Sequence, residues 1–303
     1  MFGNSGRWLC AAAVALSASV TGAGVAGADS VPEGKALVVL GDSFTANAWD
    51  FTDPDNSCLR HGKTAWPAQL GTLMGVYGTD AMVDPSCPGA SIDSGPGWTL
   101  GVETAKADKV GAFGPRTKLV ALQFGLNDHW GRSTQTLWKS LQGCVFNLVD
   151  GCGPEAAAQG RITDYNGVSG ALFADRMRNA ITYIHYYAPN AHIVLVGYPE
   201  LFQPGTDTVC LNFLGVAPFI QPRGGAVVAY FDRIQQAQQQ AAQLLNIDFL
   251  DARALTTGHG LCTDQPWLNG VMDPRTDIDG LFFHPSSKGD AVVANAIYDR
   301  FGH

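Results

Sequence analysis

The chain has 303 residues, of which 46% are hydrophobic, and it carries 27 acidic against 19 basic side chains, a formal net charge of −8. This acidic balance argues against nucleic acid or anionic lipid as a partner, because both bind basic surfaces. The sequence shows no Pro- or Ser-rich linker, charge block or internal repeat, so we expect one large α/β domain.

The first 28 residues (1–28) have the pattern of a secretory signal peptide. Arg7 precedes a long run of Ala, Val, Leu and Ser, and Ala26-Gly27-Ala28 is a small-residue cleavage pattern. The run is interrupted by Ser, Thr and Gly and is too short to span a bilayer stably. Cleavage after about Ala28 would leave 29–303 as a single domain, with Arg7 lost and the charge changed from −8 to −9. We therefore expect a secreted, soluble monomer without stable membrane insertion.

A buried strand followed by a polar turn comes early in the mature chain. Ala36–Leu40 is a continuous apolar run, and Gly41-Asp42-Ser43-Phe44 follows it directly. A serine on a tight turn leaving a buried strand can present its hydroxyl beside exposed backbone N–H groups. Taken alone, the motif also fits a serine that caps a helix. We interpret Ser43 as a candidate nucleophile and expect Asp42 to brace the turn rather than act as a base.

Short apolar runs alternate with helical patterns along the rest of the chain. The further strand candidates are Ala81–Val83, Leu119–Phe124, Ile193–Val196 and Ile247–Leu250. The helix candidates are Thr64–Met74, Thr99–Val110, Leu172–Tyr187, Ala226–Leu245 and Lys288–Phe301. Because the strands lack polar alternation and helices separate them, we predict a three-layer α/β/α sandwich with a central, mostly parallel five-stranded sheet.

Polar motifs follow the second and third strands as well as the first. Gly89 lies in the run 85–90, and Asn127 lies in Phe124-Gly125-Leu126-Asn127-Asp128. Open parallel sheets bind ligands at the carboxyl ends of their strands, so Ser43, Gly89 and Asn127 are expected at one edge. The structural alternatives are that Gly89 only makes a turn and that Asn127 only ties a loop to the backbone.

Six cysteines follow the leader, and an even number in an exported chain favours three disulfides. Sequential pairing is the simplest of the 15 connectivities that six cysteines allow, namely Cys58–Cys87, Cys144–Cys152 and Cys210–Cys262. Three connections, 130–161, 199–225 and 252–281, exceed the usual ~12–15 residues, so each is expected to be functional or constrained. No Cys-x-x-Cys or His-Glu-x-x-His motif occurs, and we expect no metal and no cofactor.

Among the seven histidines, His284 has the setting that suits a general base. Pro285 holds it off a helix, and the two serines that follow can cap the final helix. The structural alternative is a loop histidine packed against that helix. His129 is the rival candidate, since it lies two residues from Asn127.

Together, these motifs resemble the four sequence blocks of the SGNH (GDSL-type) hydrolase family, and are most similar to secreted actinobacterial lipases and esterases with three disulfides. The blocks run from Leu40 to His284, nearly the whole mature chain. The resemblance implies that Ser43 is the nucleophile and His284 the base. It also implies an oxyanion hole made by the backbone N–H groups of Ser43 and Gly89 and the side-chain amide of Asn127.

The sequence departs from this family at one position. Many members carry an Asp three residues before the histidine, whereas position 281 is Leu. We expect the backbone carbonyl of Leu281 to accept the imidazole N–H of His284, as in relatives that use a Ser–His dyad. The carboxylate of Asp279 is the alternative, and it would stabilise an imidazolium more strongly.

The expected function is that of a secreted serine esterase or lipase acting on a small-molecule or lipid ester through an acyl-enzyme. Two alternatives stay open. An acyltransferase would pass the same acyl group to a sugar or protein hydroxyl. A non-catalytic secreted binding protein on this scaffold would not need a nucleophile, a histidine and three donors together.

Overall fold

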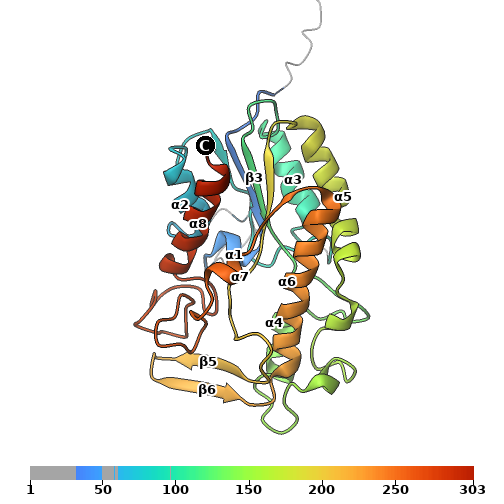
Figure 1. Ribbon diagram of the computed structural model, residues 1–303, viewed down its shortest axis with the longest axis vertical. Helices are drawn as coiled ribbons and strands as arrows, with labels where there is room; N and C mark the ends of the chain where they lie inside the picture. The colour runs from blue at the N-terminus through green and yellow to red at the C-terminus, as the bar shows by residue number, and fades with distance from the viewer. Residues whose placement is uncertain (1–31, 50–57, 59–60, 96) are drawn as a thin grey trace, which may run out of the picture. The chain divides into compact units, whose positions relative to one another are not determined.

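The central sheet has five strands in the order β2-β1-β3-β4-β7, and every neighbouring pair is parallel. The computed structural model describes residues 32–49, 58, 61–95 and 97–303, so the expected signal peptide lies outside the described residues (Figure 1). Residues 32–303 belong to one compact unit. The strands are β1 (Leu37–Gly41), β2 (Met82–Val83), β3 (Leu119–Gln123), β4 (His192–Val196) and β7 (Asp248–Leu250).

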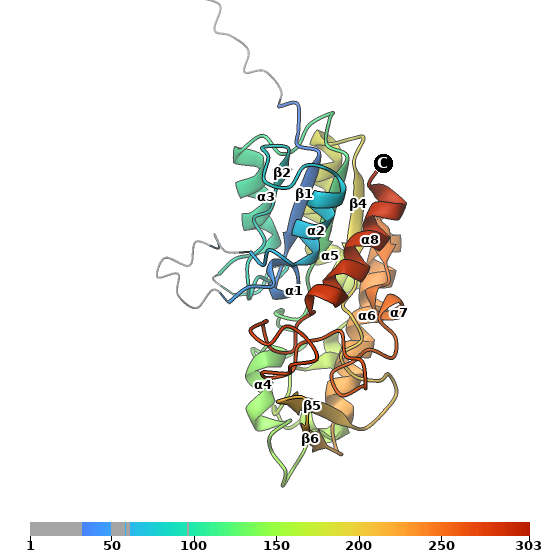
Figure 2. The same ribbon diagram turned by 90° about the vertical axis from the view of Figure 1, so that its left-hand side faces the viewer.

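Helices cover both faces of this sheet, and the alternation along β1 shows how. Leu37 and Val39 belong to a buried cluster with side chains of α2 (Trp66–Leu73) and α8 (Ser287–Phe301). Val38 and Leu40 belong to a cluster with side chains of α3 (Leu100–Lys109), α5 (Gly170–Tyr187) and α6 (Gly225–Leu245). Figure 2 shows α3 and α8 on opposite sides of β1. Since both faces are apolar, the strands are continuous hydrophobic runs, and the predicted three-layer α/β/α sandwich is confirmed.

Three of the longer helices, α3, α5 and α8, begin at a capping side chain. Thr99, Ser169 and Ser286 each accept a hydrogen bond from a backbone N–H in the first turn of α3, α5 and α8. The capping of the final helix by Ser286 is thus as expected. The helices are α2 (Trp66–Leu73), α3 (Leu100–Lys109), α5 (Gly170–Tyr187), α6 (Gly225–Leu245) and α8 (Ser287–Phe301), with shorter α1 (Ser43–Ala46), α4 (Leu137–Gly143) and α7 (Ala252–Leu255).

The structure pairs the six cysteines as predicted: Cys58–Cys87, Cys144–Cys152 and Cys210–Cys262. Each native disulfide in a secreted domain contributes about 2–4 kcal/mol to the free energy of unfolding. The long connections are therefore constrained, as the sequence indicated.

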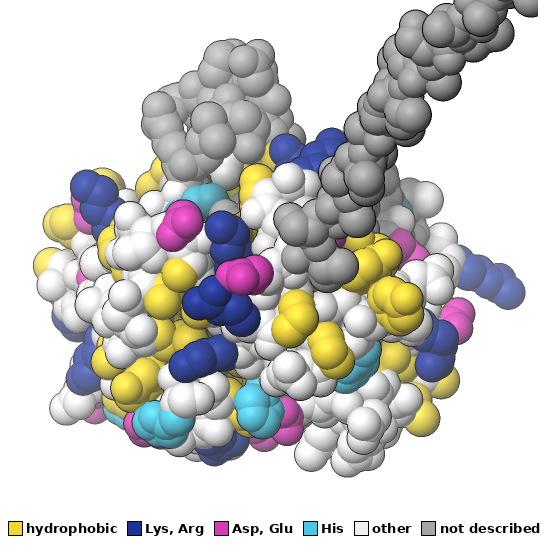
Figure 3. Space-filling model, turned by 90° about the horizontal axis from the view of Figure 1, so that it is seen from above, with side chains coloured by type: hydrophobic (Ala, Val, Ile, Leu, Met, Phe, Trp, Pro, Cys, Tyr) yellow, Lys and Arg dark blue, Asp and Glu magenta, His cyan; other side chains and the backbone are white. Residues whose placement is uncertain are grey.

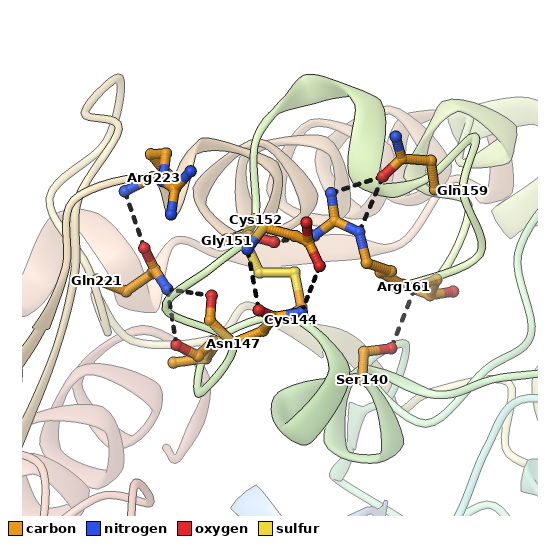
Figure 4. The surroundings of a disulfide bond; sticks show 12 residues. Ser140, Cys144, Asn147, Gly151, Cys152, Gln159, Arg161, Gln221 and Arg223 are labelled. Carbon is orange, nitrogen blue, oxygen red and sulfur yellow. Dashed lines mark hydrogen bonds between the residues drawn. A yellow bond between two sulfur atoms is a disulfide. The ribbon is translucent and has the colours of Figure 1, made fainter.

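The Cys144–Cys152 bridge closes a loop that β6 (Ala217–Gln221) holds in place (Figure 4). The Gln221 side-chain amide donates to the carbonyls of Val145 and Asn147, at 3.0 and 3.1 Å. Strand β6 pairs in antiparallel fashion with β5 (Val209–Phe213). This hairpin occupies the connection 199–225, for which the sequence predicted no strand.

The surface carries charges of both signs (Figure 3). On the face drawn in Figure 3, Lys and Arg side chains are interspersed with Asp and Glu. Across the residues that the structure describes, no helix has both the length and the apolar content to cross a membrane.

Candidate active site

The end of β1 delivers Ser43 to the carboxyl edge of the sheet. Asp42 caps α1, because its Oδ1 accepts the Phe44 N–H at 2.9 Å, and Ser43 is the first residue of that helix. Asp42 therefore braces the turn, as predicted. Within the described part of the chain, the backbone N–H groups of Ser43 and Gly89 donate no hydrogen bond to any protein group.

The imidazole of His284 meets this serine. Its Nε2 lies 2.8 Å from Ser43 Oγ, and both side chains are buried, with exposed fractions of 6% and 7%. The other ring nitrogen, Nδ1, lies 2.8 Å from the carbonyl oxygen of Phe282. A carbonyl oxygen only accepts, so Nδ1 carries the proton and Nε2 presents its lone pair to the serine hydroxyl.

The group at His284 Nδ1 is a backbone carbonyl, as expected, but it belongs to Phe282. The expectation of Leu281 is therefore wrong by one residue. The Leu281 carbonyl accepts the backbone N–H of His284 at 3.2 Å, which closes a turn and leaves the next carbonyl, that of Phe282, to meet the ring. Phe283 adopts a left-handed φ of +64° within this turn. The alternative, Asp279, is exposed, and its backbone carbonyl accepts the Trp49 indole N–H.

Two hydrogen bonds bring the expected oxyanion donors to the same edge. Cys87 N–H donates to the Gly41 carbonyl at 2.9 Å, which ties the Gly89 loop to the end of β1. Asn127 Nδ2 donates to the Ala90 carbonyl at 3.0 Å, which ties the end of β3 to the same loop. Gly89 has a φ of +85°, so glycine is favoured there, and its position is exposed.

Comparisons with known proteins identify the family of the chain. A model of the GDSL-like lipase/acylhydrolase family covers residues 39–292. The chain belongs to this family. Lipase 1 of Streptomyces coelicolor is 24% identical, with 94% of this chain and 93% of the relative covered. An esterase of Streptomyces scabiei is 29% identical, with 97% and 94% covered.

Solved structures share the fold. Phospholipase A1 from Streptomyces albidoflavus has a TM-score of 0.58 at 20% identity, with 88% of this chain and 98% of that chain covered. An extracellular lipase from Streptomyces rimosus has a TM-score of 0.58 at 19% identity, with 88% and 99% covered. The resemblance to SGNH (GDSL-type) hydrolases is therefore confirmed.

Aromatic rings surround the histidine of this GDSL-type hydrolase. The Phe44 ring centroid lies 4.3 Å from that of His284, and the Trp138 ring of α4 stacks on it at 5.5 Å. Burial lowers the pKa of His284 from 6.5 to about 4, partly offset by the hydrogen bond to Phe282. The imidazole is thus neutral and able to accept a proton at neutral pH.

Trp138 carries no sequence signal of its own, although it lies in the connection 130–161, which is unusually long. Of the aromatic residues near the motifs, Trp130 is fully buried and stacks on Phe173, so it belongs to the core. Trp49 lies beside the histidine loop, where its ring meets Phe282 edge-on at 4.8 Å.

Buried carboxylates support the edge of the sheet in this hydrolase. Glu103 of α3 accepts the Gly41 N–H at 2.7 Å, and desolvation raises its pKa well above the usual range. Asp128 accepts the Ile92 N–H at 3.0 Å, and its Oδ1 lies 3.5 Å from Arg176 Nη1. Desolvation raises the pKa of Asp128 to about 6. The sequence carries no local signal for Glu103, since an acidic residue in a helix is ordinarily exposed.

A cavity of about 1030 Å³ lies beyond the ends of β4 and β7, and its lining includes Glu200, Phe202 and Asp251 but neither Ser43 nor His284. Across the described residues, no group of three or more His, Cys, Asp or Glu side chains is arranged to hold a metal ion.

Proposed function

We propose that this chain hydrolyses carboxylic esters through an acyl-enzyme on Ser43. The observation that carries the proposal is the 2.8 Å contact between His284 Nε2 and Ser43 Oγ, with the Phe282 carbonyl at Nδ1. Nucleophile, base and orienting group thus form one chain of hydrogen bonds. Membership in the GDSL-like lipase/acylhydrolase family supports the same chemistry.

His284 takes the hydroxyl proton of Ser43 as Oγ attacks the ester carbonyl. The developing oxyanion accepts hydrogen bonds from the N–H groups of Ser43 and Gly89 and from the Asn127 amide, which retains one N–H beyond its bond to Ala90. The imidazolium then protonates the leaving alcohol, and the acyl group stays on Ser43. Water activated by His284 releases the acid and restores the serine.

The substrate is an acyl ester, and lipid esters are included. Curated relatives bear the names lipase and esterase, and the rings of Phe44 and Trp138 make the surroundings of His284 apolar. The enzyme acts after export, which the leader pattern of residues 1–28 and the three disulfides support. One structural relative is an extracellular lipase.

The test is ester hydrolysis by wild type, Ser43→Ala and Ser169→Ala, measured with p-nitrophenyl esters of increasing acyl length. Ser43→Ala is expected to lose turnover at an unchanged melting temperature. Ser169→Ala, which removes the hydroxyl that caps α5, is expected to keep wild-type turnover. Full turnover by Ser43→Ala would contradict the proposal. Free acid should also remain the main product when an alcohol is added, whereas a transferred ester as main product would indicate an acyltransferase.

A further inference from the structure

A tyrosine that the mechanism does not use lies between the parts of the site. Tyr198 follows Gly197 just after β4 and is buried, with 3% of its surface exposed. A buried phenol hydroxyl needs hydrogen-bond partners, and those of Tyr198 come from two other strand ends.

The hydroxyl joins the nucleophile turn to the oxyanion segment. It donates to Asp42 Oδ2 at 2.6 Å and accepts the backbone N–H of Leu126 at 3.3 Å. Asp42 directly precedes Ser43, and Leu126 directly precedes Asn127. One oxygen atom therefore bridges the residues next to the nucleophile and next to an oxyanion donor.

The ring of Tyr198 adds a third connection. It packs edge-on against Phe44 with centroids 5.0 Å apart, and Phe44 in turn contacts the ring of His284. Asp42 uses its other carboxylate oxygen to cap α1 through Phe44 N–H. Both oxygens of this buried side chain are thus occupied, which fixes the turn that carries Ser43.

We propose that Tyr198 is a positioning residue whose hydroxyl holds the Ser43 turn and the Asn127 segment in the geometry that the transition state needs. This inference rests on the proposed function. Without the hydroxyl, the buried Leu126 N–H and one Asp42 oxygen lose their partner, and both segments are free to shift. Displacing a reacting group by about 1 Å costs up to about 10²-fold in rate.

The chain offers a matched control in Tyr230 of α6. This phenol is also fully buried, and it donates to the carbonyls of Gly125 and Leu126 at 3.2 and 3.4 Å. It contacts the same segment after β3 but makes no hydrogen bond to the nucleophile turn. Tyr230→Phe therefore removes an equally buried hydroxyl without breaking the proposed bridge.

The experiment compares wild type, Tyr198→Phe and Tyr230→Phe in ester hydrolysis and in the rate of fluorophosphonate labelling of Ser43, with melting temperatures as the folding control. Tyr198→Phe is expected to lower kcat and the labelling rate by between about 10-fold and 10²-fold, with KM within about twofold. Tyr230→Phe is expected to keep both rates within about threefold. Unchanged rates in Tyr198→Phe, or equal losses in the two variants, would overturn the inference.

A double-mutant cycle with Asp42→Asn gives an independent readout. In Asp42→Asn, the amide oxygen still accepts the Phe44 N–H. The NH₂ group that replaces Oδ2 cannot accept the hydrogen bond that the Tyr198 hydroxyl donates in the wild type. If the two residues act through one hydrogen bond, the double variant is no slower than the slower single variant. Losses that multiply would overturn the inference. Wild type that neither turns over esters nor labels at Ser43 would instead overturn the proposed function itself.

Discussion

At the scale of single residues, a backbone carbonyl lies at His284 Nδ1, where the Asp of many SGNH hydrolases would be expected. The Phe282 oxygen holds the His284 ring in one orientation and fixes its tautomer. A neutral acceptor stabilises the imidazolium less than an ionised one does, since charge-assisted hydrogen bonds are roughly twice as strong. Orientation, rather than charge, is therefore the contribution of this group.

Asp279→Asn tests that assignment. Because Asp279 is exposed and Nδ1 already has a partner, the variant is expected to keep kcat within about twofold of wild type. Asp277→Asn is a useful comparison, since Asp277 accepts the Ser287 N–H at 2.6 Å and its loss should lower the melting temperature. A drop of several hundredfold in kcat for Asp279→Asn would assign the orienting role to its carboxylate.

Asn127→Ala removes the proposed side-chain oxyanion donor. We expect kcat to fall by about 10²–10³ with little change in KM, because the lost hydrogen bond strengthens only in the transition state. Asn190→Ala is the control, since Asn190 also donates to a backbone carbonyl, that of Pro115, at the surface. An unchanged rate in Asn127→Ala would remove this residue from the site.

At the scale of elements, α4 stacks Trp138 on the buried ring of His284. The acid limb of kcat/KM should accordingly have its midpoint near the His284 pKa of about 4, well below the ordinary 6.5. Trp138→Ala is expected to move this midpoint toward 6.5, and Trp138→Phe to move it less. A wild-type midpoint at 6.5, or an unmoved midpoint in Trp138→Ala, would contradict the role of α4.

Elements with strong local signals were predictable from the sequence. The continuous apolar strands and the capped helices appear at nearly the expected residues, because burial on both faces and capping side chains leave direct marks on the sequence. The hairpin β5–β6 and helix α4 were not predicted, since both are short and depend on distant partners such as Gln221 and the disulfides.

Some residues of the site were predictable from motifs, whereas others depend on backbone conformation and tertiary packing. Ser43, Gly89, Asn127 and His284 stand out by their motifs. The choice of Phe282 over Leu281 depends on the left-handed φ of Phe283, which no pattern in the sequence reports. Glu103 and Trp138 were missed for a related reason, since only the tertiary fold buries an acidic helix residue or brings the tryptophan of a short helix to the histidine.

At the scale of the whole molecule, buried carboxylates link stability to pH. Desolvation raises the pKa of Asp42 from 3.8 to about 7 and that of Asp128 to about 6, so folding favours their protonated forms. Stability from these groups is present at low pH and is lost as pH rises through about 6 and 7. His284 has the opposite sign, since a pKa lowered from 6.5 to about 4 makes stability fall as pH decreases from about 6.5 through about 4.

The melting temperature is therefore expected to fall between about pH 5 and pH 8. Asp42→Asn, which has no titrating group at that position, should show a smaller fall over the same range. Thermal unfolding followed by circular dichroism in buffers of equal ionic strength measures both. A melting temperature that rises from pH 5 to pH 8 in wild type would contradict the assignment.

Covalent labelling of the wild-type chain by a fluorophosphonate, followed by peptide mapping, tests most directly whether His284 activates Ser43 as the nucleophile. We expect one adduct per chain, on Ser43, which is absent from Ser43→Ala and forms at least about 10³-fold more slowly in His284→Gln. An adduct on another residue, or equal labelling rates with and without the imidazole, would contradict this activation.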